Sequence, residues 1–468
     1  MDLYAYVQQA AARFKQLPTS QPVRIIANYD ADGIAAAALL LRALHREGRT
    51  CSLSIIGQLT SDVITSFHHE PYGTYFFLDL GANMLSPLIT HLPGKYLFIF
   101  DHHYFDKAVG QEDTAVHVNP YLCGMDGTKD ISASGVTYLF ACCLNSSNRD
   151  LSVFGLIGAL GDAQEDYGFQ GMNQDILQDA VDLGLIEVKE GIRLFGARTK
   201  PLYKVLSQCT NPYLPSITGN ERAALAFLDE LHIPSRDSNG YRWLHQLHRD
   251  ELQRLFDGLL VRKAGGLDSS EKLFGPLYLL PREKIDTPLH DAREFATLLN
   301  ACGKTHKSSY ALGACLGDSS SLEKAITILS SYHREITSAL RWFYDQRGKA
   351  VIEQETYVLI RAETSIRDSL IGVIASLLSK SNLYPEGTVL IGLSHTLAGE
   401  VKVSCRISGD SERGPDLRRL MHDTLTLTGG QGGGYPIAAG AVIPQEKEDI
   451  FVTTLLDQLQ KQLLEEHI

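Results

Sequence analysis

The sequence predicts an α/β protein with an N-terminal parallel-sheet domain, a helical connector and a smaller C-terminal α/β domain. Two observations carry this prediction. Short β-branched apolar runs alternate with Ala- and Leu-rich helical segments in the first third of the chain, which is typical of right-handed crossovers in a parallel sheet. The 468 residues also exceed the roughly 100 to 200 residues of one domain.

Composition and charge exclude several classes of protein. With 44% hydrophobic and 21% charged residues, the chain is neither disordered nor fibrous in its main part. Its 43 Lys and Arg against 55 Asp and Glu give a net charge of -12, which argues against non-specific coating of nucleic acid. Any contact with nucleic acid is therefore expected to be local.

The cysteines and the N-terminal segment indicate the compartment. The eight cysteines form no CxxC pair, so we expect reduced thiols in a cytoplasmic protein. The chain shows no secretory pattern at its start and no apolar run of the ~20 residues that a membrane span needs. We therefore expect neither secretion nor insertion into a membrane.

The first predicted element is a strand at residues 23–27, followed by a polar turn and a helix at 34–46. Further strands are expected at 52–56, 74–78 and 96–100. Acidic residues follow three of these strands, and the carboxyl ends of parallel strands meet at one edge of a sheet, where ligands bind. These positions are therefore expected to converge.

The later part of the chain divides into three predicted regions. Helical segments fill a connector, a second α/β region begins near residue 275, and the end is an amphipathic helix. Strands are expected at 275–280, 310–317 and 356–362, and helices at 292–302 and 369–379. The predicted domains are 1–190, 191–270, 271–445 and 446–468.

Carboxylates and histidines at the predicted strand ends indicate chemistry. They are Asp30, Asp32, Asp79, Asp101, His102, His103 and Asp162. Taken singly, each is as well explained by a turn or a solvated side chain. Together they form a pocket of like charges that requires cations. Mixed carboxylate and imidazole ligands favour Mn²⁺, and two ions about 3.5 to 4 Å apart suit hydrolysis of a phosphoester.

Four of these segments resemble, in order and spacing, the motifs of the DHH phosphoesterase superfamily: Asp30 to Gly33, Leu78 to Gly81, Asp101 to His103, and Gly161-Asp162. Residues 432–440, with their glycine triplet, resemble the accessory DHHA1 domain. Residues 211–231 and 291–303 are similar to the archaeal RecJ-like branch, which includes nucleases associated with the replication factor GINS and the helicase Hef. The expected architecture is then a DHH domain, a connector and a DHHA1 domain.

The resemblance implies a two-metal exonuclease of DNA replication or repair, acting on single-stranded DNA or RNA with 3′-to-5′ polarity. Two Mn²⁺ ions are expected, with Mg²⁺ as a substitute, and the protein partner would be GINS or a Hef-like helicase. The implied metal ligands are Asp30, Asp32, Asp79, Asp101, His102 and Asp162. Asp79 would bridge both ions, and Asp101, His102 and His103 would be catalytic, with His103 beside the scissile phosphate.

The chain departs from the superfamily pattern in two places. Asn28 and Ile26 stand where relatives have a histidine or aspartate before the first motif, so the first metal is expected to be held weakly. Tyr435 follows the glycine triplet where relatives have histidine. A tyrosine can stack on a base but cannot carry a proton near neutral pH.

The predicted substrate-binding residues lie in the second half of the chain. Lys402, Ser404 and Arg406 alternate along a strand and share one face, while Arg293 and Asn300 are seven apart on a helix. The N–H groups of Gly432, Gly433 and Gly434 can approach phosphate without hindrance, and Tyr435 can stack on a base. A solvated face or a flexible turn explains each of these patterns equally well.

Two alternatives stay open beside the exonuclease. One is a phosphodiesterase of short oligonucleotides or cyclic dinucleotides, as other DHH/DHHA1 proteins are. The other is a catalytically weakened scaffold subunit of a replication or repair complex, which Asn28, Ile26 and Tyr435 favour.

Overall fold

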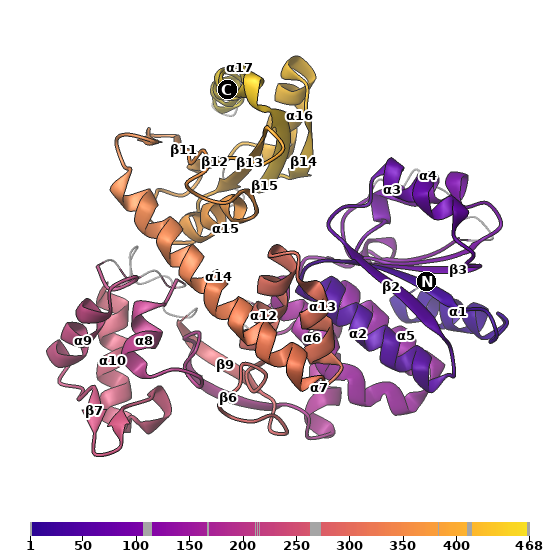
Figure 1. The fold of residues 1–468 in the computed structure, drawn as a ribbon, viewed down its shortest axis with the longest axis horizontal. Coiled ribbons are helices and arrows are strands. Elements are labelled where there is room, and N and C mark those ends of the chain that lie inside the picture. Colours follow the sequence, from indigo (N-terminus) through magenta and orange to yellow (C-terminus); the bar gives the residue numbers. More distant parts are fainter. Residues whose placement is uncertain are drawn as a thin grey trace. The chain divides into compact units, whose positions relative to one another are not determined.

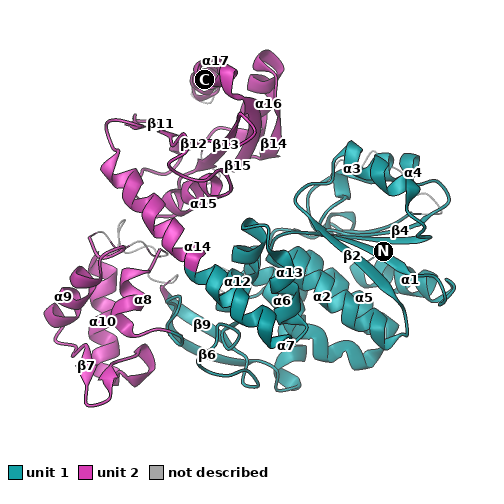
Figure 2. Ribbon diagram, in the orientation of Figure 1, with its two compact units in different colours: residues 1–199, 274–330 teal, residues 200–273, 331–468 magenta. Residues whose placement is uncertain are grey.

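The computed structural model describes residues 2–105, 115–165, 168–210, 212, 214, 216–262, 273–381, 383–409 and 414–465. The contacts divide the chain into two compact units, residues 1–199 with 274–330 and residues 200–273 with 331–468 (Figure 2). Residues 274–330 thus group with the N-terminal unit, although the sequence suggested a boundary at 270. The other domain boundaries stay predictions.

A five-stranded parallel sheet forms the centre of the first unit, as the sequence predicts. Its strand order is β2-β1-β3-β4-β5. The strands are β1 (Val23–Asn28), β2 (Cys51–Ile56), β3 (Thr74–Leu78), β4 (Tyr96–Phe100) and β5 (Ala115–Val118). Every pairing between neighbours is parallel, so all the carboxyl ends lie at one edge.

Helices cover both faces of this sheet (Figure 1). They are α1 (Leu3–Lys15), α2 (Ala31–Arg46), α3 (Ser61–Ser66), α4 (Leu85–His91) and α5 (Ala133–Leu144), and α6 (Ser152–Gly161) packs on α2 and α5. Neighbouring residues of a strand point to opposite faces. Phe76 therefore packs with Phe14 and Phe140, while Phe77 joins a cluster with Ile64 and Leu88.

The rest of the first unit brings distant segments onto this core. It comprises α7 (Gly171–Asp182), an antiparallel pair of β6 (Glu187–Ile192) and β9 (Phe274–Leu279), α12 (Ala292–Lys304) and α13 (Ser308–Cys315). The prediction of a strand at 310–317 is wrong, because α13 occupies most of this range. Its buried residues Ala311, Ala314 and Cys315 recur at the spacing of a helix that packs on α2.

The second unit contains helices and a mixed sheet. Its first part holds α8 (Leu202–Ser207), α9 (Glu221–Glu230), α10 (Arg249–Arg262) and a short hairpin of β7 (Arg236–Asp237) and β8 (Gly240–Tyr241). The long helix α14 (Ser319–Asp345) leads to the sheet. The sheet order is β10-β11-β12-β13-β15-β14.

The strands of this sheet are β10 (Val351–Glu353), β11 (Tyr357–Arg361), β12 (Val389–His395), β13 (Glu400–Ile407), β14 (Gln431–Tyr435) and β15 (Ala438–Pro444). The helices are α15 (Asp368–Ser379), α16 (Leu417–Thr428) and α17 (Glu448–Glu465). The glycine run expected to form a phosphate-holding loop is largely the strand β14, which lies at the edge of the sheet with all five residues exposed.

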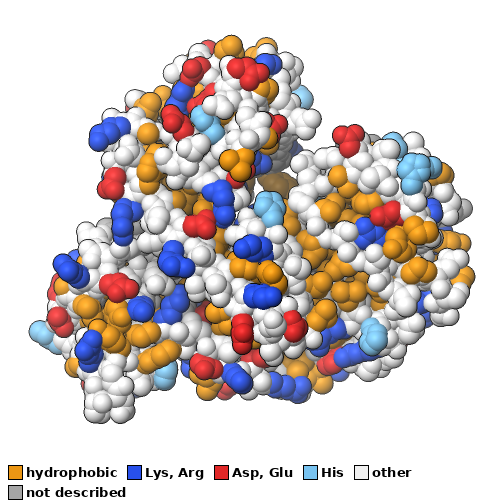
Figure 3. All heavy atoms as spheres, in the orientation of Figure 1, with side chains coloured by type: hydrophobic (Ala, Val, Ile, Leu, Met, Phe, Trp, Pro, Cys, Tyr) orange, Lys and Arg blue, Asp and Glu red, His pale blue; other side chains and the backbone are white. Residues whose placement is uncertain are grey.

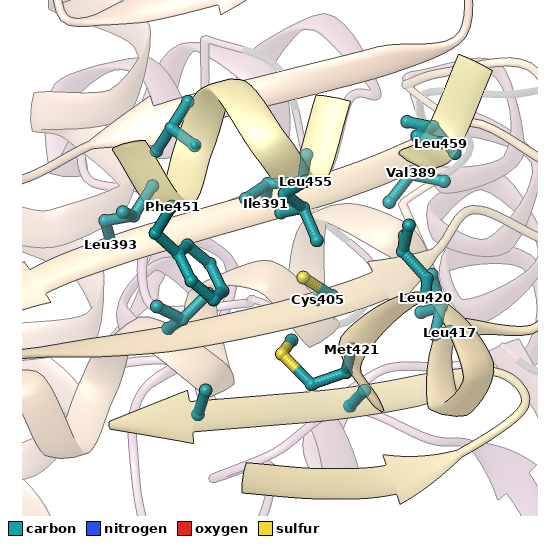
Figure 4. Packing of buried hydrophobic residues seen from close by; sticks show 14 of the residues in the cluster. Val389, Ile391, Leu393, Cys405, Leu417, Leu420, Met421, Phe451, Leu455 and Leu459 are labelled. Atoms are coloured by element: carbon teal, nitrogen blue, oxygen red, sulfur yellow. The ribbon is translucent and has the colours of Figure 1, made fainter. Parts of the chain in front are cut away.

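An apolar core joins α16 and α17 to this sheet. Figure 4 shows Phe451 and Leu455 of α17 beside Ile391 of β12 and Met421 of α16. Phe451 is fully buried. The predicted terminal amphipathic helix is therefore an integral part of the second unit.

No helix among the described residues combines the length and the apolar character needed to cross a membrane.

We expect Phe451→Ala to lower the free energy of unfolding by about 3 to 5 kcal/mol, because it leaves a cavity in this core. Urea denaturation followed by circular dichroism measures the change. The matched control is Leu464→Ala on the same helix, where the side chain is 66% exposed and a change below about 0.5 kcal/mol is expected. Equal losses in the two variants would contradict the packing described.

Candidate metal centre

The ends of the strands bring four segments of the first unit together. Asp30 caps α2 directly after β1, Asp79 follows β3, His102 lies just after β4, and Asp162 ends α6. Asp79 has a φ of 59°, the left-handed region that non-glycine residues rarely adopt. Such backbone strain concentrates at functional sites.

His102 lies at the centre of the cluster. Its Nε2 is 3.0 Å from Asp162 Oδ2, 3.3 Å from Asp79 Oδ1 and 3.9 Å from Asp32 Oδ2. On the other side of the ring, Nδ1 lies 2.6 Å from the carbonyl oxygen of Gly127. A carbonyl can only accept, so Nδ1 carries the hydrogen and neutral His102 presents the lone pair of Nε2 to the carboxylates.

This arrangement fits a divalent cation. Oxygen and nitrogen lone pairs repel one another unless a positive charge lies between them, and the buried atoms Asp79 Oδ1 and His102 Nε2 have no hydrogen-bond partner. Two overlapping groups have ligand atoms within 4.8 Å of one another: Asp32, Asp79, His102 and Asp162, and Asp79, His102 and His103. Mixed carboxylate and imidazole ligands suit Mn²⁺ and exclude a thiolate zinc site here.

The pKa shifts in this cluster point to the same need for positive charge. Burial, followed by the charge of Asp30, holds the pKa of Asp79 well above its usual range. Burial and the charge of Asp32 raise the pKa of Asp162 to about 6. Burial opposes protonation of His102, but the facing carboxylates of Asp162 and Asp79 outweigh it and raise the pKa of His102 well above 6.5. Without a cation, protons bound to these side chains offset the negative charge of the cluster.

Two backbone N–H groups hold the side chain of Asp32. Its two oxygens accept hydrogen bonds from the backbone N–H groups of Ala133, at 2.7 Å, and Ser134, at 3.0 Å, in the first turn of α5. The positive end of the helix dipole favours this buried negative charge. At Gly158, a Cβ atom would lie 2.1 Å from Asp32 Oδ1, so only glycine lets α6 approach so closely.

The amide of Asn28 links two of the predicted ligands. Its Nδ2 donates to Asp30 Oδ2 at 3.1 Å and to Asp79 Oδ2 at 3.0 Å. The amide thus sits between the carboxylates that the superfamily pattern assigns to the first metal. Asp30 belongs to neither group of close ligand atoms.

Asp101 also lies outside these groups and holds His103 instead. Its Oδ1 is 2.7 Å from Nδ1 of His103, and its Oδ2 accepts from the backbone N–H of Ala82 at 2.8 Å. Burial opposes ionisation of Asp101, yet His103 and this N–H lower its pKa. The predicted roles of Asp101 as a metal ligand and of His103 at the phosphate stay predictions.

Sequence reasoning missed the residues that support His102. Gln164 Nε2 donates to the same Gly127 carbonyl at 2.9 Å, and Gln164 Oε1 accepts from Asn173 Nδ2 at 2.8 Å. These three residues lie outside the motifs and have no sequence signal of their own. Ser132 was detectable, because a serine before an apolar helix is a recognisable N-cap, and it caps α5.

Arg293 and Asn300 lie on one face of α12, as the sequence predicts, and both contact the protein itself. Arg293 donates to the carbonyl of Pro276 at 2.8 Å and forms an ion pair with Glu165. Asn300 contacts the backbone of Ala31 and Gly161. Their predicted contact with substrate stays a prediction.

The other predicted substrate residues belong to the second unit. Lys402, Ser404 and Arg406 lie on β13, which confirms the predicted strand; Lys402 and Arg406 are partly exposed and Ser404 is buried. Arg406 Nε donates to Ser376 Oγ at 2.9 Å, and burial lowers its pKa. Gly432, Gly433, Gly434 and Tyr435 lie on β14.

A groove of about 790 Å³ runs beside part of this strand. Its lining residues are Arg418, Arg419, His422, Leu425, Thr426, Gly430, Gln431, Gly432 and Gly433. Among the described residues, no carboxylate belongs to this lining, although Asp416 pairs with Arg418 and Asp423 with Arg419. On the face shown in Figure 3, by contrast, acidic and basic side chains are interspersed.

Without divalent cations, we expect Asp162→Asn to be more stable than the wild type at neutral pH. The pKa of Asp162 is raised to about 6 in the folded chain. The contribution of Asp162 to the free energy of unfolding is therefore fully present below about pH 4, and it is lost as the pH rises through about 6. The loss is on the order of 1 to 3 kcal/mol. The raised pKa of His102 acts in the same direction.

Thermal unfolding in EDTA between pH 4 and 8 measures this difference. The two curves should meet near pH 4 and diverge above pH 6, and Mn²⁺ should reverse the order at neutral pH by stabilising the wild type. Parallel curves across this range would show that Asp162 carries no unfavourable charge.

Comparison with known proteins agrees with this architecture. A family model described as the DHH-CID domain matches residues 194–270, and the DHHA1 domain model matches residues 355–461. An uncharacterised protein of Methanocaldococcus jannaschii is 26% identical over 449 residues, which cover 94% of each chain.

Several solved structures share the fold at low sequence identity. CDC45 from Entamoeba histolytica is 13% identical with a TM-score of 0.66, covering 98% of this chain and 99% of that one. An exonuclease RecJ bound to manganese is 15% identical with a TM-score of 0.57, covering 96% and 93%.

RecJ from Thermus thermophilus in complex with Mn²⁺ is 14% identical with a TM-score of 0.60. The match covers 97% of this chain but 55% of the Thermus chain, so this protein spans about half of that relative's length. The chain thus carries matches to the DHH-CID and DHHA1 domain models, and it shares its fold with RecJ exonucleases and CDC45.

Proposed function

We propose that the protein is a Mn²⁺-dependent exonuclease that hydrolyses phosphodiester bonds of single-stranded DNA or RNA from the 3′ end. The observation that carries the proposal is His102, whose Nε2 faces three carboxylates while Gly127 fixes its tautomer. A buried imidazole in this setting is arranged to bind a cation. A structural core would have replaced these charges with apolar groups.

Asp32, Asp79, His102 and Asp162 would hold the ion. Divalent cations supply polarisation of the phosphoryl oxygen and promote ionisation of water. His103 is half exposed, and its Nδ1 faces Asp101, which raises its pKa against the effect of burial. A protonated His103 is then suited to stabilise negative charge on a phosphate.

Groups of the second unit are suited to hold the nucleic acid strand. Lys402 and Arg406 bring positive charge to one face of β13, and the groove beside β14 carries two further arginines. Tyr435, which is 40% exposed, is placed to stack on a base. We propose these residues, with Ser404 and the glycines 432–434, as the substrate surface.

We expect ladder products from end-labelled single strands in Mn²⁺, with weaker activity in Mg²⁺ and none in EDTA. His102→Ala removes the central nitrogen ligand and should lower the rate at least ~100-fold, since neighbouring carboxylates cannot replace it. Denaturing gels over time measure the products, and labelling each end in turn gives the polarity.

The matched control is His245→Ala, which changes a histidine of the second unit outside the described metal groups and should leave the rate unchanged. Cleavage of dinucleotides or cyclic dinucleotides without cleavage of long strands would assign the protein to the small-substrate phosphodiesterases. Binding of strands without cation-dependent turnover would contradict both enzymes.

A scaffold subunit is the second candidate, and a specific observation favours it. The amide of Asn28 bridges Asp30 and Asp79, where the superfamily pattern places the first metal. The fold is also shared with CDC45 over the whole chain. In this role the protein would join a replication or repair complex through GINS or a Hef-like helicase.

Replacing Asn28 tests the number of cations. Asn28→Asp removes the bridging donor and adds a carboxylate ligand, so we expect the chain to bind a second Mn²⁺ at least tenfold more tightly. Isothermal titration calorimetry with metal-free protein counts the ions and gives their affinities. An unchanged second affinity would show that Asn28 does not limit occupancy of the first site.

A further inference from the structure

We propose that helix α12 positions Asp162 for cation binding and that Asn300 is the residue through which the helix acts. The inference rests on the proposed function, because the ion that it concerns is the one proposed above. Helix α12 packs against α2 and α6, whose ends carry the acidic motifs (Figure 1). It begins about 130 residues after Asp162 in the sequence and belongs to the same unit.

One amide joins the backbones of two acidic motifs. Asn300 Oδ1 accepts from the N–H of Ala31 at 2.9 Å, and Asn300 Nδ2 donates to the carbonyl of Gly161 at 3.3 Å. Ala31 directly precedes Asp32, and Gly161 directly precedes Asp162. Asp32 and Asp162 belong to the same group of four candidate ligands, so Asn300 sets the spacing between them.

The other end of the segment that carries Asp162 is fixed by the same helix. Glu165 is 5% exposed and pairs with Arg293 of α12 and, at 2.6 Å, with Arg193. The hydroxyl of Tyr278 donates to the same carboxylate at 3.2 Å. Arg293 and Asn300 are seven residues apart, roughly two turns of one helical face. Residues 161–165 are therefore held at both ends by α12.

Asp162 needs this support more than Asp32 does. Asp32 is fully buried and held by two backbone N–H groups of α5. The side chain of Asp162 is 21% exposed and faces His102, and the next residue, Ala163, has a φ of 55°. The left-handed conformation is unfavourable for alanine, so the surrounding contacts must impose it.

The contacts of Asn300 favour positioning over direct contact with a nucleic acid strand. Both its oxygen and its nitrogen are engaged by backbone groups, and these two bonds fix the orientation of the amide. A positioning residue and a substrate ligand also predict different measurements. The first changes the affinity for the ion without substrate, and the second changes the KM for the strand.

The test is Mn²⁺ affinity of the full chain without substrate, measured by electron paramagnetic resonance of the free ion. Asn300→Leu keeps the volume of the side chain and removes both hydrogen bonds, so we expect about tenfold weaker binding. Asn300→Ala should do the same. The control is Thr297→Ala on the same helix, whose hydroxyl donates to the carbonyl of Arg293 within α12. Its affinity should match the wild type.

A double-mutant cycle identifies the residue through which Asn300 acts. In the Asp162→Asn background, Asn300→Leu should have little further effect on Mn²⁺ affinity, whereas in the His103→Ala background it should keep its full effect. At saturating Mn²⁺, the KM for a single strand should be unchanged. The circular dichroism spectrum of each variant checks that the fold is retained.

Wild-type Mn²⁺ affinity in Asn300→Leu would overturn the positioning role while leaving the exonuclease proposal intact. A full tenfold loss in the Asp162→Asn background would also overturn it. Cation binding that responds as expected, in a chain that cleaves no strand, would reject the exonuclease and support the positioning role. A wild-type chain that binds no Mn²⁺ would overturn both.

Discussion

The gathering of negative charge at one edge of a parallel sheet is the constraint on which the first unit depends. Buried carboxylates repel one another unless hydrogen bonds, protons or cations offset their charge. The chain uses each of these means at different positions: helix N–H groups at Asp32, an amide between Asp30 and Asp79, and the ring of His102 among the remaining oxygens. The raised pKa values of Asp79 and Asp162 indicate that the protein's own hydrogen-bond donors do not fully offset the negative charge at these two carboxylates.

The negative charge of the candidate metal centre is offset unevenly, and the centre therefore has two parts. Around His102, ligand atoms face one another without an intervening donor, and the residues behind the ring hold it in one tautomer. Around Asp30, the amide of Asn28 already satisfies the carboxylates. The unsatisfied ligand atoms are therefore concentrated around His102 and not around Asp30.

The second unit is built on a different principle. Its sheet is mixed, its core lies between the strands and the helices α16 and α17, and its edge strand β14 is glycine-rich and exposed. Basic groups on β13 and along the groove beside β14 offset the acidic composition of the chain locally. A net charge of -12 is therefore compatible with a surface for a polyanion, because part of the negative charge belongs to the metal centre.

The sequence by itself determined the parallel sheet and the convergence of the acidic motifs at its edge, because these follow from hydrophobic periodicity and from residues close together in the chain. The sequence predicted a strand where α13 forms, because the periodicity of so short an apolar run does not distinguish a strand from a helix. Packing against α2 favours the helix. Only the tertiary structure decided how the motif residues are used. Asp101 supports His103, Asn28 takes a bridging position, and α12 meets the segment of Asp162. The reason is physical: hydrogen-bond partners such as Gly127 and Asn300 come from segments whose approach depends on packing, and no local pattern encodes it.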